Sequence, residues 1–151
     1  MSITRRVFLK NGALAIVGAS VVPSFRPETH WIALGHALGQ QGVNLVLPWG
    51  TSDERARGAR IAAALPRARV PKWAPLDAVA RLIAGAQFVV GVDTGLMHLA
   101  AALGVPLVAI FAGSKPALTG PVGSGPIAVL GAEGAAPTVE AVIDAVARIV
   151  R

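Results

Sequence analysis

The stretch QFVVGVDTGLMHLAAALGVPLVAIF, residues 87–111, contains the pattern that decides the fold. A β-branched apolar run over 87–92 leads into the turn Asp93-Thr94-Gly95, a helical segment over 96–103 and a second apolar run over 105–111. Both runs are continuously apolar rather than alternating, which is typical of strands that are covered on both faces of a sheet. The stretch therefore predicts a strand–helix–strand unit with parallel strands.

Segments of the same two kinds alternate along the rest of the chain from residue 27. We expect, in order, helix 28–41, strand 43–47, helix 53–65, strand 69–70, helix 76–84, strand 127–130 and helix 138–150. Gly42 is a stop signal for the first helix, Thr51 or Ser52 can cap the second, and Thr138 can cap the last. This alternation predicts an α/β fold with a Rossmann-like, doubly wound parallel sheet, whose ligands bind at the carboxyl ends of the strands.

Residues 1–25 have a different character. The segment TRRVFLK, residues 4–10, resembles the twin-arginine export consensus, and the apolar stretch from Gly12 to Val22 follows it. That stretch is shorter than the about 20 apolar residues that a membrane span needs. Val17-Gly18-Ala19 offers a small-residue cleavage site. We predict a leader over 1–25 and a folded domain over 27–151, with an amphipathic or buried first helix as the alternative to the leader.

The charge of the chain is uneven. The formal net charge is +6, but residues 27–151 carry ten basic and eight acidic side chains, so much of the excess lies in the first 26 residues. This balance does not favour nucleic acid as a partner, because that would need a larger clustered basic surface. Six basic residues fall between Arg55 and Lys72. They are typical of a solvated helix face, and the alternative is attraction to an anionic substrate or lipid.

The turn after the strand that ends at Val92 is the strongest candidate site. A strand that leads into a helix points the free backbone N–H groups of Thr94, Gly95 and Leu96 outward, with the positive end of the helix dipole behind them. Asp93 can accept hydrogen bonds from sugar hydroxyls, and His98 lies one turn further along the helix. The alternative is simple capping, with Asp93 or Thr94 as the N-cap and His98 partly buried.

Two further segments follow strands in the same way. Leu47-Pro48-Trp49-Gly50 precedes Glu54, whose carboxylate could chelate the two ribose hydroxyls of a nucleotide or could merely complement the helix dipole. Residues 111–120 could frame a base with backbone groups or form a plain surface loop. Because all three segments follow parallel strands, they should line one crevice. Together they favour a nucleotide-diphosphate ligand.

The sequence contains no cysteine, no convincing metal-ligand spacing and no Walker A or Gly-x-Gly-x-x-Gly pattern.

The chain resembles a known family in four sequence elements. The elements that carry the resemblance are Pro27-Glu28-Thr29-His30-Trp31, Leu47-Pro48-Trp49-Gly50 with Glu54, Asp93-Thr94-Gly95-Leu96-Met97-His98-Leu99, and Pro116-Ala117-Leu118-Thr119-Gly120-Pro121. They are similar, in order and spacing, to the C-terminal domain of the lipopolysaccharide heptosyltransferase I family, which has the two-domain GT-B architecture. The resemblance runs from about Pro27 to the C-terminus.

The resemblance implies inverting transfer of L-glycero-D-manno-heptose from ADP-heptose to Kdo of the lipopolysaccharide inner core. It implies Glu54 at the ribose, Thr94 and Gly95 at the diphosphate, Asp93 at the heptose and His98 beside the phosphates. No metal or other cofactor is implied. The family works at the cytoplasmic face of the inner membrane, with possible association with that membrane, whereas a functional leader would direct export to the periplasm.

The sequence departs from the family pattern in three places. The N-terminal domain is missing, and with it the acceptor site and the catalytic aspartate, so no catalytic residue is assigned in this chain. Ser24 and Arg26 stand where the family has a phosphate-binding lysine and a tryptophan, and Lys115 stands where it usually has an acidic residue. We therefore expect weak binding of ADP-heptose or ADP, with little transfer to Kdo-lipid A unless the other domain is supplied. The alternatives are a non-enzymatic nucleotide-binding module or an inactive exported fragment.

Overall fold

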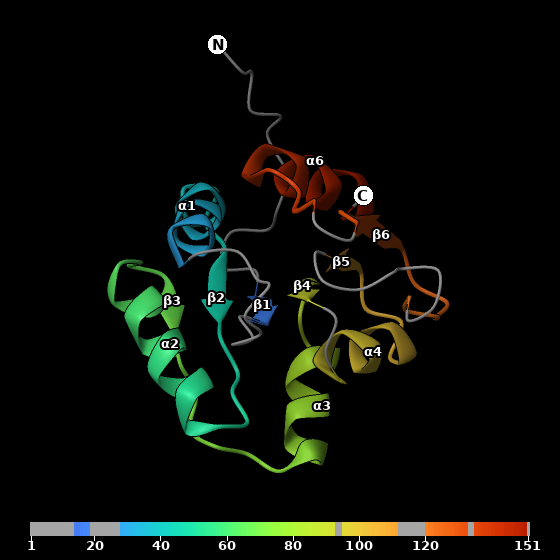
Figure 1. Ribbon diagram of the computed structural model, residues 1–151. Coiled ribbons are helices and arrows are strands. Elements are labelled where there is room, and N and C mark those ends of the chain that lie inside the picture. The colour runs from blue at the N-terminus through green and yellow to red at the C-terminus, as the bar shows by residue number, and fades with distance from the viewer. Residues whose placement is uncertain (1–13, 19–27, 93–94, 112–119, 133–134, 151) are drawn as a thin grey trace.

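The computed structural model describes residues 14–18, 28–92, 95–111, 120–132 and 135–150. The chain alternates between strands and helices (Figure 1). The elements, in order, are β1 Leu14–Gly18, α1 Glu28–Gly39, β2 Asn44–Val46, α2 Ser52–Ala63, β3 Ala68–Arg69, α3 Leu76–Ala84, β4 Phe88–Val92, α4 Gly95–Ala102, β5 Leu107–Ile110, β6 Ile127–Leu130 and α6 Val139–Ile149. Every helix and strand expected from residue 27 onward is present, with ends shifted by one or two residues where they differ.

The described strands form one parallel sheet in the order β3-β2-β1-β4-β5-β6. This is the strand order of dinucleotide-binding folds, and the direction of winding reverses between β1 and β4. The register places Ile16 of β1 level with Val46 of β2 on one side and with Val89 of β4 on the other. The expected doubly wound α/β fold is therefore confirmed.

Helices cover the two faces of the sheet and create two separate apolar cores. Along β4, Phe88, Val90 and Val92 pack toward α1, α2 and α6, whereas Val89 packs toward α3 and α4. Both clusters consist of side chains that are almost wholly withdrawn from water. Burying one such side chain stabilises the fold by about 1.5–3 kcal/mol. Continuous burial of β4 explains why its sequence is apolar at every position rather than at every second one.

Several helices begin and end where local sequence signals predict. Gly42, which follows α1, has a φ of 83°, a left-handed conformation that glycine adopts without steric cost. The hydroxyl of Thr138 accepts a hydrogen bond from the backbone N–H of Ala141 at 3.1 Å and caps α6. Such a cap satisfies a helical donor that would otherwise have no partner within the helix.

The expected start of the folded domain at residue 27 needs correction. Residues 14–18 form β1, which lies in the middle of the sheet and pairs with both β2 and β4. These residues belong to the apolar stretch that we assigned to the leader. A short apolar run is typical both of the core of a signal peptide and of a buried strand, so hydrophobic periodicity does not distinguish these two structures. Whether the first residues also direct export stays a prediction.

Candidate functional site at the carboxyl edge of the sheet

The turn between β2 and α2 holds the Glu54 carboxylate in a fixed position. The backbone N–H of Gly50 donates a hydrogen bond to Glu54 Oε2 at 2.8 Å, and the backbone N–H of Glu54 donates to Thr51 Oγ1 at 3.2 Å. Thr51 is therefore the N-cap of α2, as one of the two expected candidates. The arrangement is close to a capping box, in which side chain and backbone satisfy each other reciprocally.

Glu54 lies in the first turn of α2, so the structure shows its position at the helix N-terminus, whereas the ribose contact stays a prediction. One carboxylate oxygen, Oε2, closes the turn, while Oε1 accepts no hydrogen bond from the described residues. The side chain is half-buried at the positive end of α2, where a carboxylate is favoured. A preorganised carboxylate with one open oxygen is suited to accept hydrogen bonds from sugar hydroxyls.

Trp49 ties this turn to the loop between β3 and α3. Its indole Nε1 donates a hydrogen bond to the backbone carbonyl of Pro71 at 2.8 Å. The Arg55 guanidinium lies over the ring, 5.4 Å from its centroid, which is the geometry of a cation–π contact. The two turns that follow β2 and β3 are therefore held against each other. The sequence had placed Trp49 in a motif but gave no sign of this contact, because its partner lies 22 residues away.

The N-terminus of α4 opens onto the same edge of the sheet. Gly95, the first residue of the helix, is exposed, and a Cβ built on it would meet no atom of the described residues within 4 Å. Leu96 is half-buried against the α3–α4 core, Met97 is fully buried, and His98 is exposed. Among the described residues, the first position of α4 therefore faces open space.

Several predicted site residues lie outside the described part of the chain. Asp93 and Thr94 directly precede α4, and residues 112–119 contain most of the third expected segment. The structure brings the Glu54 turn and the Gly95 turn to one edge, because β2 and β4 are both parallel to β1, which lies between them. That edge includes the point where the winding reverses, which is where open α/β sheets bind their ligands.

An ion pair joins α1 and α2. Arg60 of α2 donates from Nη2 to Oε1 of Glu28 at 2.6 Å and from Nε to both carboxylate oxygens at 3.0 and 3.2 Å. Hydrogen bonds from Arg60 lower the pKa of Glu28 below its ordinary value of 4.5, and the positive charge of Arg57 acts in the same direction. Glu28 and Trp31 belong to the motif that begins at Pro27; in the structure Glu28 forms this ion pair, and Trp31 is buried in the core.

This ion pair predicts a pH-dependent contribution to stability. Because the pKa of Glu28 is lower in the folded chain, the pair stabilises above about pH 4.5, and the contribution is lost as the pH falls through the folded pKa. We expect Arg60→Gln to lower the thermal midpoint slightly at neutral pH, because both side chains are solvent-accessible. The difference from the native chain should vanish in acid, as thermal unfolding followed by circular dichroism at several pH values will show. A difference that persists at pH 3 would contradict this assignment.

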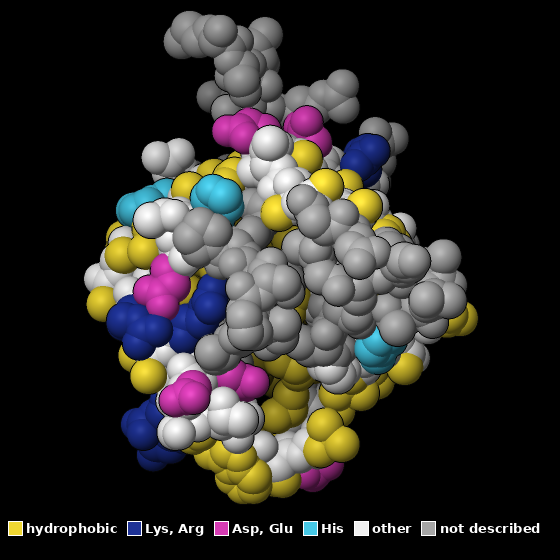
Figure 2. Space-filling model, in the orientation of Figure 1, with side chains coloured by type: hydrophobic (Ala, Val, Ile, Leu, Met, Phe, Trp, Pro, Cys, Tyr) yellow, Lys and Arg dark blue, Asp and Glu magenta, His cyan; other side chains and the backbone are white. Residues whose placement is uncertain are grey.

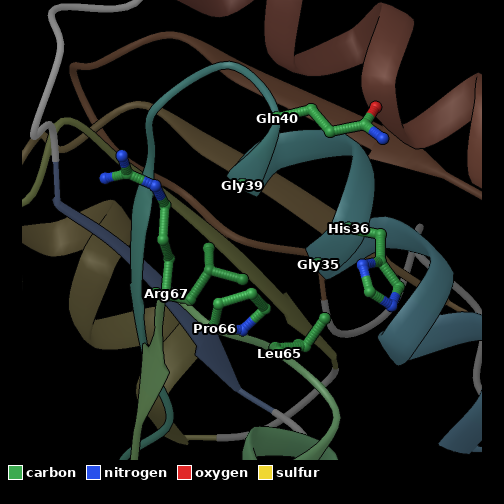
Figure 3. A pocket seen from close by; sticks show the side chains of 8 residues that line it. Gly35, His36, Gly39, Gln40, Leu65, Pro66 and Arg67 are labelled. Atoms are coloured by element: carbon green, nitrogen blue, oxygen red, sulfur yellow. The ribbon is translucent and has the colours of Figure 1, made fainter.

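A separate cavity lies at the opposite, amino edge of the sheet (Figure 3). Its volume is about 180 Å³. Arg67 and His36 lie on opposite sides of it, with Gly35, Leu65 and Pro66 between them. Arg67 Nη1 donates to Asn44 Oδ1 at 3.4 Å and to the backbone carbonyl of Gly42 at 3.5 Å, so neighbouring residues already provide its partners. His30 and His36 are exposed residues of α1. Because this cavity lies at the far edge, it is not part of the candidate site.

Comparisons with known proteins identify the family of the chain. The sequence profile of the family described as Glycosyltransferase family 9 (heptosyltransferase) matches residues 10–145. The chain belongs to this family. The match includes β1 and so begins well before the boundary that we expected at residue 27. Within the described residues, no helix combines the length and apolar character that a membrane crossing requires.

Curated relatives are lipopolysaccharide heptosyltransferases. The chain is 42% identical over 106 residues to lipopolysaccharide heptosyltransferase 1 of Pseudomonas aeruginosa, which covers 70% of this chain and 30% of that protein. It is 36% identical over 113 residues to lipopolysaccharide heptosyltransferase 2 of Escherichia coli K12, which covers 70% of this chain and 32% of that protein. The chain therefore spans about a third of the length of these relatives.

Solved structures of family members share the fold. Escherichia coli heptosyltransferase WaaC, determined with ADP, superimposes with a TM-score of 0.79 at 35% identity, over 89% of this chain and 43% of that one. ADP-heptose lipopolysaccharide heptosyltransferase II of Escherichia coli gives a TM-score of 0.79 at 29% identity, over 93% of this chain and 46% of that one. The superposition thus covers somewhat less than half of each of these two solved chains.

Proposed function

We propose that this chain is the donor-binding half of a heptosyltransferase and that it binds the ADP portion of ADP-heptose at the carboxyl edge of its sheet. The proposal rests on two features of this edge. The Glu54 carboxylate is held in place by a hydrogen bond from Gly50, and the N-terminus of α4 faces open space among the described residues. The strands that precede them, β2 and β4, lie on either side of β1. The relative WaaC has been solved with ADP and with ADP-2-deoxy-2-fluoro heptose, which supports a donor of this class.

In this proposal each side of the site meets a different part of the donor. Glu54 Oε1 accepts hydrogen bonds from the ribose hydroxyls, while Oε2 stays with Gly50. The N–H groups of Thr94, Gly95 and Leu96 meet the diphosphate, with the positive end of α4 behind them. Asp93 binds the heptose, and His98 lies beside the phosphates. No metal ion is required, because the helix N-terminus supplies the positive potential.

The proposed reaction of the complete enzyme is inverting transfer. A hydroxyl of Kdo in the lipopolysaccharide inner core attacks the anomeric carbon of the heptose, and the bond to the β-phosphate oxygen breaks. The N–H groups at the start of α4 stabilise the negative charge that develops on the departing ADP. We place this reaction at the cytoplasmic face of the inner membrane. The acceptor and the catalytic base belong to the other domain, so this chain alone should bind the donor and transfer little, since positioning supplies much of the barrier reduction.

Isothermal titration calorimetry with ADP and with ADP-heptose tests the proposal directly. We expect saturable binding of both ligands at a single site. A parallel assay of heptose transfer to Kdo-lipid A should give no more than trace product until the N-terminal domain of a relative is added in trans. Absence of heat at millimolar ligand would exclude the donor site. Efficient heptose transfer by the chain alone would exclude the proposal that catalysis needs the other domain.

Glu54→Gln provides the sharpest test of the ribose contact. The amide oxygen of glutamine can still accept from Gly50, so the turn should persist, while the charge that binds the hydroxyls is lost. Because a hydrogen bond to a charged group contributes about 1.5–3 kcal/mol, ADP affinity should fall at least about tenfold. Asp53→Asn is the matched control, since it removes the same charge from the adjacent exposed residue. Equal losses in the two variants would indicate general electrostatics instead of a specific contact.

A further inference from the structure

An open groove lies on the outer side of the loop between β3 and α3. It has a volume of about 390 Å³ and is formed by α2, the turn after β2 and the loop itself. Two indole rings, those of Trp49 and Trp73, and two cations, Arg55 and Lys72, line it together with small apolar residues. No carboxylate contributes to the lining. The groove therefore combines positive charge with aromatic surface.

The same loop exposes large apolar side chains to solvent. Trp73 is 62% exposed and Leu76, the first residue of α3, is 72% exposed. In Figure 2, hydrophobic side chains gather at the lower end of the molecule, where Figure 1 places this loop and the start of α3. Tryptophan is favoured at the headgroup level of a bilayer, where its ring is partly apolar and its N–H remains solvated.

Positive charge extends from the groove along the neighbouring side of the molecule. Residues 55–72 contain six basic and no acidic side chains, and dark blue side chains lie along the α2 and β3 side in Figure 2. The acidic neighbours are Asp53 and Glu54 at the start of α2, Glu28, which is paired with Arg60 at 2.6 Å, and Asp77, which is paired with Arg81 at 3.2 Å. An excess of cations beside exposed apolar groups matches the surface of an anionic bilayer.

We propose that this face, formed by Arg55, Lys72, Trp73 and Leu76, is a contact surface for anionic membrane lipid. Trp73 and Leu76 enter the headgroup region, and Lys72 and Arg55 bind lipid phosphates. Pro71 and Pro75 bracket the loop and fix its backbone, so little conformational entropy is lost when the side chains insert. None of these four residues is among those proposed to bind the donor, and the surface would hold the domain next to a membrane-borne acceptor.

Cosedimentation of the full chain with lipid vesicles tests this surface. Vesicles of phosphatidylcholine and phosphatidylglycerol should bind the chain, and vesicles of phosphatidylcholine alone should bind it much more weakly. Trp73→Ser should weaken binding to the anionic vesicles by about tenfold, from the apolar area that no longer inserts. Lys72→Gln should weaken it by about fivefold, the contribution of one basic residue near such a surface. Added salt should reduce the effect of Lys72→Gln more than that of Trp73→Ser.

Matched controls separate this face from the rest of the chain. Val122→Ser removes an 88% exposed apolar side chain, and Arg148→Gln removes an exposed cation from α6; both should bind vesicles as the native chain does. All four variants alter exposed residues, and thermal unfolding will confirm that each is folded. The proposal is overturned if Trp73→Ser and Lys72→Gln bind vesicles no more weakly than the controls. It is also overturned if they weaken ADP binding in calorimetry instead, because the groove would then belong to the donor site.

Discussion

Replacing Gly95 with aspartate is expected to eliminate measurable ADP binding while leaving the fold at least as stable as the native one. Gly95 is exposed at the first position of α4, and a side chain there meets open space among the described residues. A carboxylate at a helix N-terminus is stabilising, because it complements the dipole. The same carboxylate would occupy the position proposed for the diphosphate and repel it. Like-charge contacts cost several kcal/mol, so affinity should fall by at least about 100-fold.

Gly95→Asn is the control that separates charge from bulk. Asparagine has nearly the same size and shape as aspartate but no charge, so it should reduce ADP affinity through steric contact alone and less severely. Calorimetry with ADP and thermal unfolding of both variants provide the two measurements. The charge argument is wrong if the two variants lose affinity equally, and the site is wrong if Gly95→Asp binds ADP like the native chain.

The succession of helices and strands from residue 28 onward could be predicted because local signals agree with burial there. β4 is continuously apolar and is buried at every position, and Thr51 and Thr138 cap the helices that they precede. Secondary structure can be predicted from a sequence where local preference and tertiary packing agree in this way. The two-sided covering of the sheet follows from the same apolar runs.

The detailed geometry of the site could not be predicted, because it depends on contacts between distant residues. The sequence suggested a ribose contact or a dipole role for Glu54, but only the structure shows that one carboxylate oxygen accepts a hydrogen bond from Gly50, while the other accepts none from the described residues. The link between Trp49 and Pro71 likewise joins two turns that no local pattern connects. Turns are placed by the elements they join, so their mutual geometry emerges only when the sheet is assembled.

β1 illustrates how the same residues can satisfy two patterns. An export signal typically consists of basic residues, a short apolar run and a small-residue cleavage site, and residues 1–19 match this pattern up to Val17-Gly18-Ala19. In the structure, however, residues 14–18 occupy the middle of the sheet. A central strand in a parallel sheet is also short and apolar, so the composition alone does not distinguish them. The choice between the two has a large consequence for the folded protein.

Removal of residues 1–19, the product expected from cleavage after Ala19, should abolish folding. The sheet would lose the strand that pairs with both β2 and β4, and the two halves would no longer be joined by backbone hydrogen bonds. Unpaired backbone groups and exposed apolar strand edges on both sides would cost more than the about 5–15 kcal/mol by which a domain is normally stable. Circular dichroism and thermal unfolding should show no cooperative transition, and calorimetry should show no ADP binding.

Removal of residues 1–9 is the control for this experiment. It eliminates both arginines of the twin-arginine pattern but keeps β1 and every residue of the family match, which begins at residue 10. This shorter chain should unfold cooperatively and bind ADP like the native protein. If the chain without residues 1–19 also folds and binds ADP, then β1 is dispensable and residues 14–18 are free to act as part of a cleaved signal. If it does not, export by cleavage at Ala19 and a folded donor domain are mutually exclusive, because one event removes what the other requires.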